Sequence, residues 1–247
     1  MNSTHNMMEI AEAAARHAGT LLLGAAEEGC RIDSQEHHDI KLKADRMSEE
    51  LILAELKATG DVAILSEEAG IVRGEMRGLY WAVDPLDGTI NYSRGIPLCC
   101  VSVGLWDGDE PVCGAVYDFY RGEMFSGIAR EGAWLNGRAI RVSDVSLKEK
   151  GILVSGFPAR ADLSEEAIRG FIDAAKSYRK LRYLGSAALS LVYVACGRAD
   201  AYAERSIMLW DVAGAAAIIL GAGGKISCKE TSKPFCFDVL ATNGRIT

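Results

Sequence analysis

The chain has 247 residues, of which 49% are hydrophobic and 25% charged, a composition typical of a globular protein that can bury a large core. Its 27 Lys and Arg residues against 34 Asp and Glu give a formal net charge of −7, which argues against a basic nucleic-acid-binding surface. The longest uncharged apolar run, residues 212–224, is shorter than the ~20 residues that a membrane span needs, so no membrane association is expected.

The N-terminal part of the chain is predicted to contain two amphipathic helices. Apolar residues recur at helical spacing over residues 7–28 and again over residues 44–58. The polar residues 31–41 between these patterns predict a loop. We interpret the pair His37-His38 within it as solvated side chains, with metal ligation as the alternative.

The middle of the chain has the pattern of short strands. After a first strand at residues 62–65, an apolar run at residues 79–83 leads directly into Asp84. The runs that follow are separated by short turns, such as Asp107-Gly108, and therefore predict an antiparallel meander. Its further strands are expected at residues 98–106, 111–117 and 123–128.

The C-terminal part alternates between strand and helix patterns, and helix layers that cover mixed sheets are the simplest way to bury the apolar faces of all these elements. The strands are expected at residues 152–155, 180–184, 199–203, 225–227 and 238–241. The helices are expected at residues 164–176, 187–196 and 210–220. No linker rich in Pro or Ser divides the chain, so both parts are expected to pack as one unit.

Two aspartates after the apolar run 79–83 form the most informative motif. The sequence Asp84-Pro85-Leu86-Asp87-Gly88-Thr89 combines hard carboxylate oxygens with a proline of fixed φ and a glycine that permits a tight turn. Thr89 is expected to cap a short helix whose first N–H groups would face an anion. The motif thus predicts a Mg²⁺ site beside a phosphate cradle, and a strand followed by a simple Asp-Gly turn is the alternative.

Further acidic residues could join this site, although each also has an ordinary explanation. Asp211 opens an otherwise uncharged helix, where a carboxylate also interacts favourably with the helix dipole. Small residues follow Asp211 and predict that its helix lies close to another backbone. Glu67 and Glu68 follow the strand at 62–65, where paired glutamates are commonly solvated, and Asp45 at a helix start needs no function.

Together these stretches resemble the inositol monophosphatase family, in their order and across nearly the whole chain. Residues 84–89 look like the first signature of the family and residues 210–224 like its second, and residues 185–189 and 197–202 extend the likeness. The resemblance implies an α+β protein with the layered αβαβα sugar-phosphatase fold. It further implies one catalytic domain, 1–247, whose halves, about 1–145 and 146–247, supply the metal-binding and the substrate side.

The resemblance also implies ligands for two or three Mg²⁺ ions. Carried onto this sequence, Glu67, Asp84 and the backbone carbonyl of Leu86 would hold the first ion. Asp84, Asp87 and Asp211 would hold the second.

Catalytic roles follow from the same resemblance. Asp45 would lie with Glu67 near a weaker third metal position, and Thr89 would help one of these two acids to orient and deprotonate the attacking water. The backbone N–H groups of Gly88 and Thr89 would hold phosphate oxygens.

On the substrate side, the resemblance implies contacts from the second half of the chain in addition to Asp87. Gly185, Ser186 and Ala187 would line the sugar, and Glu204 takes the place of the acceptor for a substrate hydroxyl. Arg205 beside it suits recognition of a second substrate phosphate, with a surface arginine paired to an acid as the alternative.

The resemblance therefore implies Mg²⁺-dependent hydrolysis of a phosphate monoester of a polyol or sugar, such as myo-inositol 1-phosphate. The short segment 31–41 resembles that of members which also accept fructose-1,6-bisphosphate. The alternatives are a nucleotide 3′-phosphatase, a histidinol-phosphatase, or a catalytically silent metabolite-binding protein on the same fold. The resemblance further suggests a homodimer and inhibition by Li⁺.

Seven cysteines occur, an odd number without a CxxC motif, which indicates reduced thiols and a cytoplasmic protein. The vicinal pair Cys99-Cys100 is interpreted as small apolar filler on a buried strand, with a redox switch as the alternative.

Overall fold

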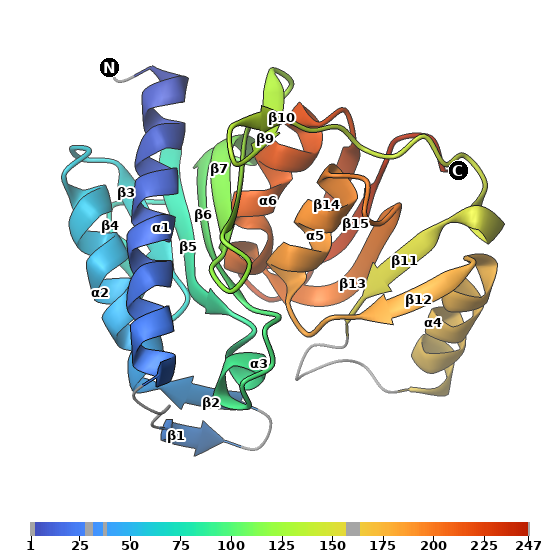
Figure 1. Ribbon diagram of the computed structural model, residues 1–247, viewed down its shortest axis with the longest axis horizontal. Coiled ribbons are helices and arrows are strands. Elements are labelled where there is room, and N and C mark those ends of the chain that lie inside the picture. The colour runs from blue at the N-terminus through green and yellow to red at the C-terminus, as the bar shows by residue number, and fades with distance from the viewer. Residues whose placement is uncertain (1–2, 28–31, 37–38, 157–163, 247) are drawn as a thin grey trace.

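The computed structural model describes residues 3–27, 32–36, 39–156 and 164–246, and two β-sheets run through it (Figure 1). The first sheet has the strand order β10-β9-β8-β7-β6-β5-β3-β4. Strands β5 to β10 form an antiparallel meander, of which the sequence predicts β5 to β8, and β3 lies parallel to β5. These strands are β3 (Ala63–Ser66), β4 (Gly70–Arg73), β5 (Leu79–Asp87), β6 (Cys100–Asp107), β7 (Glu110–Asp118), β8 (Glu123–Ile128), β9 (Gly132–Leu135) and β10 (Arg138–Ala139).

The second sheet has the strand order β12-β11-β13-β15-β14. It is mixed, as predicted, because β11 is parallel to both of its neighbours whereas β15 is antiparallel to β13 and β14. Its strands are β11 (Ile152–Ser155), β12 (Lys180–Tyr183), β13 (Ala201–Met208), β14 (Lys225–Glu230) and β15 (Cys236–Thr242).

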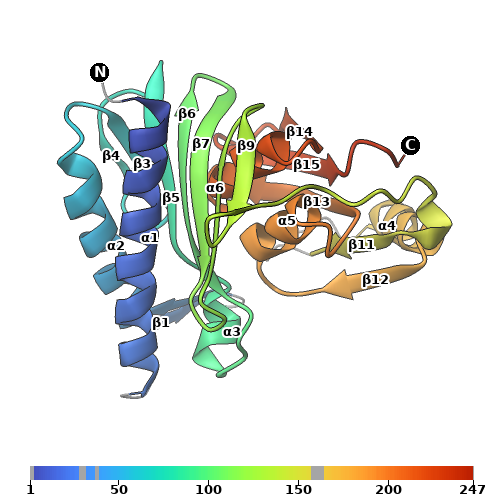
Figure 2. The same ribbon diagram turned by 45° about the horizontal axis from the view of Figure 1, so that its top comes forward.

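Helices cover the sheets and separate them (Figure 2). Helices α1 (Thr4–Glu27) and α2 (Lys43–Lys57) pack on the first sheet, while α5 (Ala187–Ala195) and α6 (Leu209–Gly221) contact strands of both sheets, and α4 (Glu165–Ser177) packs against β12. This order of layers confirms the expected αβαβα fold of the α+β class. Within the described residues, no helix combines the length and the apolar character that a bilayer span requires.

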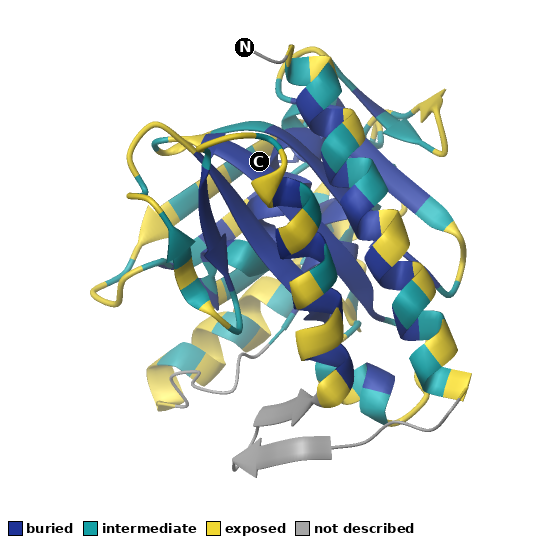
Figure 3. Cartoon of the chain, turned by 90° about the vertical axis from the view of Figure 1, so that its left-hand side faces the viewer, coloured by how far each residue is buried: buried dark blue, intermediate teal, exposed yellow. Residues whose placement is uncertain are grey.

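Strand β5 carries side chains into two cores. Trp81 and Val83 face α1 and α2, whereas Tyr80 and Ala82 belong to the core around α6, as the two-residue period of a strand requires. On α1 and α2, buried side chains likewise line the side toward the sheet and exposed ones the side toward solvent (Figure 3). Burial on both faces fixes the register of β5, and with it the position of the residues at its carboxyl end.

The structure corrects several details of the predicted elements. Residues 31–41, predicted as a loop, contain the antiparallel ribbon of β1 (Ile32–Glu36) and β2 (Asp39–Leu42), because backbone pairing satisfies N–H and C=O groups without an apolar pattern. The sequence patterns also miss β4, β9 and β10, strands of only two to four residues. His37-His38 and Cys30 lie outside the described residues.

Thr89 does not cap the short helix α3 (Thr89–Ser93), contrary to the prediction. Gly88 occupies the cap position with a φ of 89°, and Thr89 is the first helical residue. The left-handed φ favours glycine, and a Cβ at this position would lie only 2.9 Å from the carbonyl oxygen of Leu98. The Thr89 hydroxyl instead donates to the carbonyl of Leu86 at 3.0 Å.

Helix α6 lies close to the first sheet because a row of small residues crosses the strands beneath it. Ala82, Gly104, Gly114 and Gly127 pair across β5, β6, β7 and β8. A Cβ on either Gly104 or Gly114 would lie 2.3 Å from backbone atoms of α6. The small residues that follow Asp211 thus bring this helix against another backbone, as predicted from the sequence.

Gly114→Ala is expected to destabilise the fold, because its Cβ would lie 2.3 Å from the carbonyl oxygen of Gly214 in α6. Relieving this contact requires the helix to move away from the sheet, so the free energy of unfolding should fall by about 1–3 kcal/mol or more. Chemical denaturation measures this loss. Gly170→Ala in α4 is the matched control, since nothing lies within 4 Å of its Cβ and it should stabilise the helix by about 1 kcal/mol. A Gly114→Ala variant as stable as the wild type would contradict the close contact.

The cysteines in the described part of the chain are all free thiols. Cys99 and Cys100 are fully buried, as apolar filler on a strand would be. Cys100 has a second feature, since its Sγ lies 3.7 Å from Oδ2 of Asp87 and 3.8 Å from Oγ of Ser186. Burial and the Asp87 carboxylate hold the pKa of the Cys100 thiol well above its usual range, so it stays protonated there.

Candidate functional site

The carboxyl end of β5 carries the two aspartates of the first motif. Asp84 and Asp87 are only 2% and 8% exposed, and the pairing of β5 with β6 is irregular between them. The N–H of Leu86 donates to Oδ1 of Asp84 at 2.9 Å, and the hydroxyl of Ser48 in α2 donates to the carbonyl of Pro85 at 2.7 Å. These bonds fix the backbone that presents both carboxylates.

Glu67 lies beside Asp84 because the parallel strands β3 and β5 end at the same edge of the sheet. Its N–H donates to the carbonyl of Val83 at 3.1 Å, and its carboxyl group shares a hydrogen bond with that of Asp84. Burial and the nearby Asp211 carboxylate hold the pKa of Glu67 well above its usual range. Asp45, buried at the start of α2, also raises it.

Glu49 supports the segment that carries Glu67, a role that the sequence interpretation misses. Its Oε1 accepts hydrogen bonds from the hydroxyl of Ser66 and, at 3.0 Å, from the N–H of Ala69. Glu49 is only 7% exposed and shares the buried face of α2 with apolar side chains. A glutamate on the apolar face of an amphipathic helix is the sequence signal that could have identified it.

Asp87 is held by the N-terminus of α5, which comes from the second half of the chain. The hydroxyl of Ser186 and the N–H of Ala188 donate to its Oδ2 at 2.5 and 2.7 Å. The N–H of Ala187 donates to Oδ1 at 3.3 Å. Burial raises the pKa of Asp87, and these donors partly offset that rise. Ser186 and Ala187, expected along the sugar, thus bind the Asp87 carboxylate.

Asp211 stands in the first turn of α6 and completes the group. Its Oδ2 accepts the N–H of Met208 at 2.9 Å. Burial and the Asp87 carboxylate raise the pKa of Asp211 to about 8. Burial and Glu67 likewise hold the pKa of Asp84 well above its usual range. We refer to Glu67, Asp84, Asp87 and Asp211 as the carboxylate cluster.

The donor set of the carboxylate cluster fits a divalent cation. Acids that raise one another's pKa values cannot all be ionised side by side without compensating positive charge, and Glu67 and Asp84 are close enough to be joined by a hydrogen bond. Carboxylate and carbonyl oxygens are the ligands that Mg²⁺ prefers. In the part of the chain that the structure describes, no three acidic, His or Cys side chains already stand at metal-ligand geometry.

The segment expected to hold phosphate follows directly after Asp87. Gly88 and Thr89 begin α3, and the first N–H groups of a helix have no acceptor within the helix itself. The carbonyl of Leu86, expected as a metal ligand, accepts the Thr89 hydroxyl and keeps a second lone pair. The arrangement places N–H donors and an acceptor carbonyl beside the carboxylate cluster.

Glu204 of β13 borders the cluster on the substrate side. Burial, with a smaller contribution from the Asp87 carboxylate, raises the pKa of Glu204 to about 7. The Tyr202 hydroxyl donates to Oε2 of Glu204 at 2.8 Å, and this hydrogen bond partly offsets the rise in pKa. Gly156 leaves room for the carboxyl group, since a Cβ there would lie 2.3 Å from Oε2. Arg205 is exposed, at an irregularity in the pairing of β13. Sequence reasoning missed Tyr202 as a partner, although it lies in the segment 197–202 that carries the family likeness.

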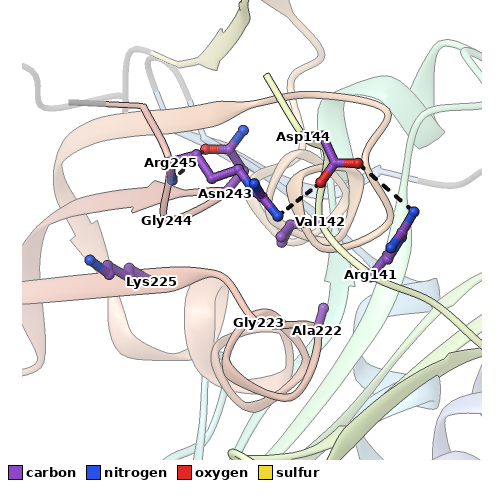
Figure 4. A pocket seen from close by; sticks show the side chains of 9 residues that line it. All are labelled: Arg141, Val142, Asp144, Ala222, Gly223, Lys225, Asn243, Gly244 and Arg245. Carbon is purple, nitrogen blue, oxygen red and sulfur yellow. Dashed lines mark hydrogen bonds and ion pairs between the residues drawn. The ribbon is translucent and has the colours of Figure 1, made fainter. Parts of the chain in front are cut away.

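A separate cavity of about 260 Å³ lies at the other end of α6 from Asp211 (Figure 4). Asp144 lines this cavity and forms ion pairs with two arginines that also line it. Its Oδ1 lies 3.0 Å from Nη2 of Arg245, and its Oδ2 lies 3.8 Å from Nη2 of Arg141. None of the carboxylate cluster lines this cavity. The candidate site is therefore defined by its acids and their hydrogen bonds, and this cavity does not belong to it.

Comparisons with known proteins identify the family to which the chain is similar. The sequence pattern of the inositol monophosphatase family matches residues 3–246. An inositol-1-monophosphatase of Synechocystis sp. is 40% identical over 213 residues, which cover 84% of this chain and 74% of that protein. A protein of Xylella fastidiosa named Nus factor SuhB is 41% identical over 217 residues, 86% of this chain and 78% of that protein.

Solved structures give the same result. The inositol monophosphatase from Anabaena (Nostoc) sp. matches with a TM-score of 0.84 at 35% identity, covering 98% of this chain and 92% of that one. The extragenic suppressor protein suhB from Bartonella henselae matches with a TM-score of 0.86 at 29% identity, covering 97% of this chain and 94% of that one.

Proposed function

Because the chain belongs to the inositol monophosphatase family, we propose that it hydrolyses myo-inositol 1-phosphate or a similar monoester of a polyol or sugar, with Mg²⁺ as the required cation. Family membership makes the chain a phosphoric monoester hydrolase. The observation that carries the proposal is the carboxylate cluster, four acids whose mutual repulsion calls for a cation where a phosphate cradle begins.

The cluster residues would divide between two cations. Glu67, Asp84 and the Leu86 carbonyl would hold one, and Asp84, Asp87 and Asp211 the other, with Asp84 common to both. The bound cations supply positive charge that acidifies water and stabilises the oxygens of the reacting phosphate. A weaker third position would lie between Asp45 and Glu67, where the Asp45 carboxylate contributes to the raised pKa of Glu67.

The remaining groups of the site would bind and orient the substrate. The N–H groups of Gly88 and Thr89 would hold phosphate oxygens, which removes the need for a basic side chain there. Glu67, or Asp45, would accept a proton from the attacking water, with the Thr89 hydroxyl as an orienting partner. Glu204 would accept a hydrogen bond from a substrate hydroxyl, and Gly185, Ser186 and Ala187 would shape the sugar side.

Phosphate release from a panel of esters, with and without Mg²⁺, tests this proposal. Myo-inositol 1-phosphate is expected to be hydrolysed, and fructose-1,6-bisphosphate also if Arg205 receives a second phosphate. Adenosine 3′,5′-bisphosphate and histidinol phosphate represent the alternative substrates, and hydrolysis of one of them alone would replace the polyol assignment. No release from any ester, by folded protein with Mg²⁺, would favour the silent metabolite-binding protein instead.

Glu204→Gln is expected to weaken the use of polyol substrates selectively. Loss of a charged hydrogen-bond acceptor should raise KM for myo-inositol 1-phosphate about 10–100-fold. An aryl phosphate without hydroxyl groups, such as p-nitrophenyl phosphate, should be hydrolysed as by the wild type. Glu230→Gln, on an exposed position of the same sheet, is the matched control. Equal losses on both substrates would contradict the assignment of Glu204 to the substrate hydroxyl.

We also propose that the chain forms a homodimer and is inhibited by Li⁺ at the second cation position. Exposed apolar side chains on α4 and on the edge strand β12 support self-association, among them Ile168, Ile172 and Tyr183. Sedimentation velocity would test the dimer, and Li⁺ titration of phosphate release the inhibition. A monomer at micromolar concentration would contradict the first proposal, and insensitivity to Li⁺ the second.

A further inference from the structure

The side chain of Asn91 in α3 connects two segments that are far apart in the sequence. Its Nδ2 donates to the carbonyl of Leu98 at 2.7 Å and to the carbonyl of Leu184 at 2.8 Å. An amide nitrogen carries two hydrogens, so both are used in bonds of ordinary length. Asn91 therefore ties the loop that follows α3 to the turn that precedes α5.

The turn before α5 is shaped to receive this amide. Gly185 has a φ of 73°, and a Cβ on it would lie 2.9 Å from Nδ2 of Asn91. Any side chain at this position would therefore push the amide away from the Leu184 carbonyl. One residue later, Ser186 is 4% exposed and donates to Oδ2 of Asp87.

The other segment bound by Asn91 supports the phosphate cradle. The carbonyl oxygen of Leu98 lies 2.9 Å from the position of a Cβ on Gly88, so the Gly88 backbone packs directly on it. The backbone carbonyl of Asn91 also accepts the N–H of Ile96 at 2.9 Å, which orders the same loop. A single side chain thus holds the cradle and the N-terminus of α5 at a fixed separation.

We propose that Asn91 is a positioning residue for the Asp87 carboxylate, acting through the Leu184 carbonyl and the turn that carries Ser186, Ala187 and Ala188. Without the amide, this turn loses its tie to the loop after α3, and the three donors no longer share one fixed geometry around Asp87. The inference rests on the proposed function, because it assigns Asn91 to the affinity of the carboxylate cluster for Mg²⁺.

Calorimetric titration of metal-stripped protein with Mg²⁺ tests the proposal without relying on turnover. Asn91→Ala is expected to bind Mg²⁺ about 10–100-fold more weakly, as is usual when an outer partner of a metal ligand is lost. Ser93→Ala is the matched control in the same short helix, since its hydroxyl donates to the nearby carbonyl of Ile90, and its affinity should equal that of the wild type. A folded Asn91→Ala variant with wild-type affinity would overturn the proposal.

A double-mutant cycle with Ser186→Ala separates positioning from a general structural effect. If Asn91 acts through the turn, Asn91→Ala should cost much less affinity in the Ser186→Ala background than alone. Additive losses would place Asn91 on a separate route and overturn the proposal. If Asn91→Ala fails to fold, Asn91→Leu replaces it, because leucine has a similar side-chain volume but no hydrogen-bond donors. If both variants are unfolded, Asn91 determines the fold and not the site, and the proposal is overturned.

Different outcomes would overturn the proposed function and the role of Asn91. A folded wild type that neither binds Mg²⁺ nor releases phosphate would overturn the proposed function and the role of Asn91 together. A wild type that does both, beside an Asn91→Ala variant with unchanged affinity, would overturn the role of Asn91 alone.

Discussion

Asp84→Asn is expected to abolish measurable phosphate release while the protein stays folded. Asp84 is the one acid assigned to both cations, and an amide at this position brings a neutral oxygen and an N–H₂ group where positive charge must bind. Charge stabilisation by bound metal is worth several kcal/mol, so kcat should fall by about 1,000-fold or more. The variant should keep its fold, because the amide oxygen can still accept the N–H of Leu86, which donates to Asp84 at 2.9 Å.

Asp107→Asn provides the matched control for this substitution. Asp107 is the exposed last residue of β6, the strand beside β5, and the same change of carboxylate to amide there should leave kcat unaltered. Phosphate release at saturating myo-inositol 1-phosphate and Mg²⁺ compares the two variants. Undiminished turnover by Asp84→Asn would overturn the assignment of the metal ligands.

The second large effect is expected on stability, in the absence of metal. Burial and neighbouring acids hold the pKa values of Glu67 and Asp84 well above their usual range and raise that of Asp211 to about 8. Between about pH 4 and pH 8 the folded protein therefore binds more protons than the unfolded chain does. Stability should consequently fall as pH rises through this window, because deprotonation leaves like charges buried together.

Melting temperatures of chelator-treated protein between pH 5 and pH 8.5 measure this effect. The wild type is expected to lose stability steadily, whereas Asp84→Asn should lose less, since one of the coupled acids is gone. Mg²⁺ at 100 times its Kd should add about 2.7 kcal/mol, a rise in Tm of about 5–11 °C for a chain of this size. Stability that stays level or increases across this pH range without metal would contradict a mutually repelling cluster.

Much of the fold could be predicted from local patterns. The apolar runs before Asp84 and after Asp211 correspond to β5 and α6, because a buried strand and a helix between two sheets both need nearly continuous apolar sequence. The ribbon of β1 and β2 could not be predicted in this way, since it pairs by backbone alone. The sequence favours Thr89 as the helix cap, but the left-handed φ of Gly88 places the cap one residue earlier.

The site was less accessible to sequence reasoning, because its contacts join distant segments. Asp84 and Asp87 are close in the sequence, so the local pattern is enough to place both at the end of one strand. Glu67 and Asp211 are added only by the resemblance to the family. The partners of Asp87 on α5 depend on how the second half of the chain packs, which no spacing rule gives. The resemblance places Ser186 near the substrate. Its hydrogen bond to Asp87 depends on tertiary packing and cannot be predicted from the sequence.

Cation-dependent hydrolysis at the carboxylate cluster is the central expected property of this protein. The most direct measurement is phosphate release from myo-inositol 1-phosphate by metal-stripped protein as Mg²⁺ is added back. No release is expected without the cation, followed by a saturable rise as it is restored. Release that proceeds at full rate in the presence of a chelator would contradict the role assigned to Glu67, Asp84, Asp87 and Asp211.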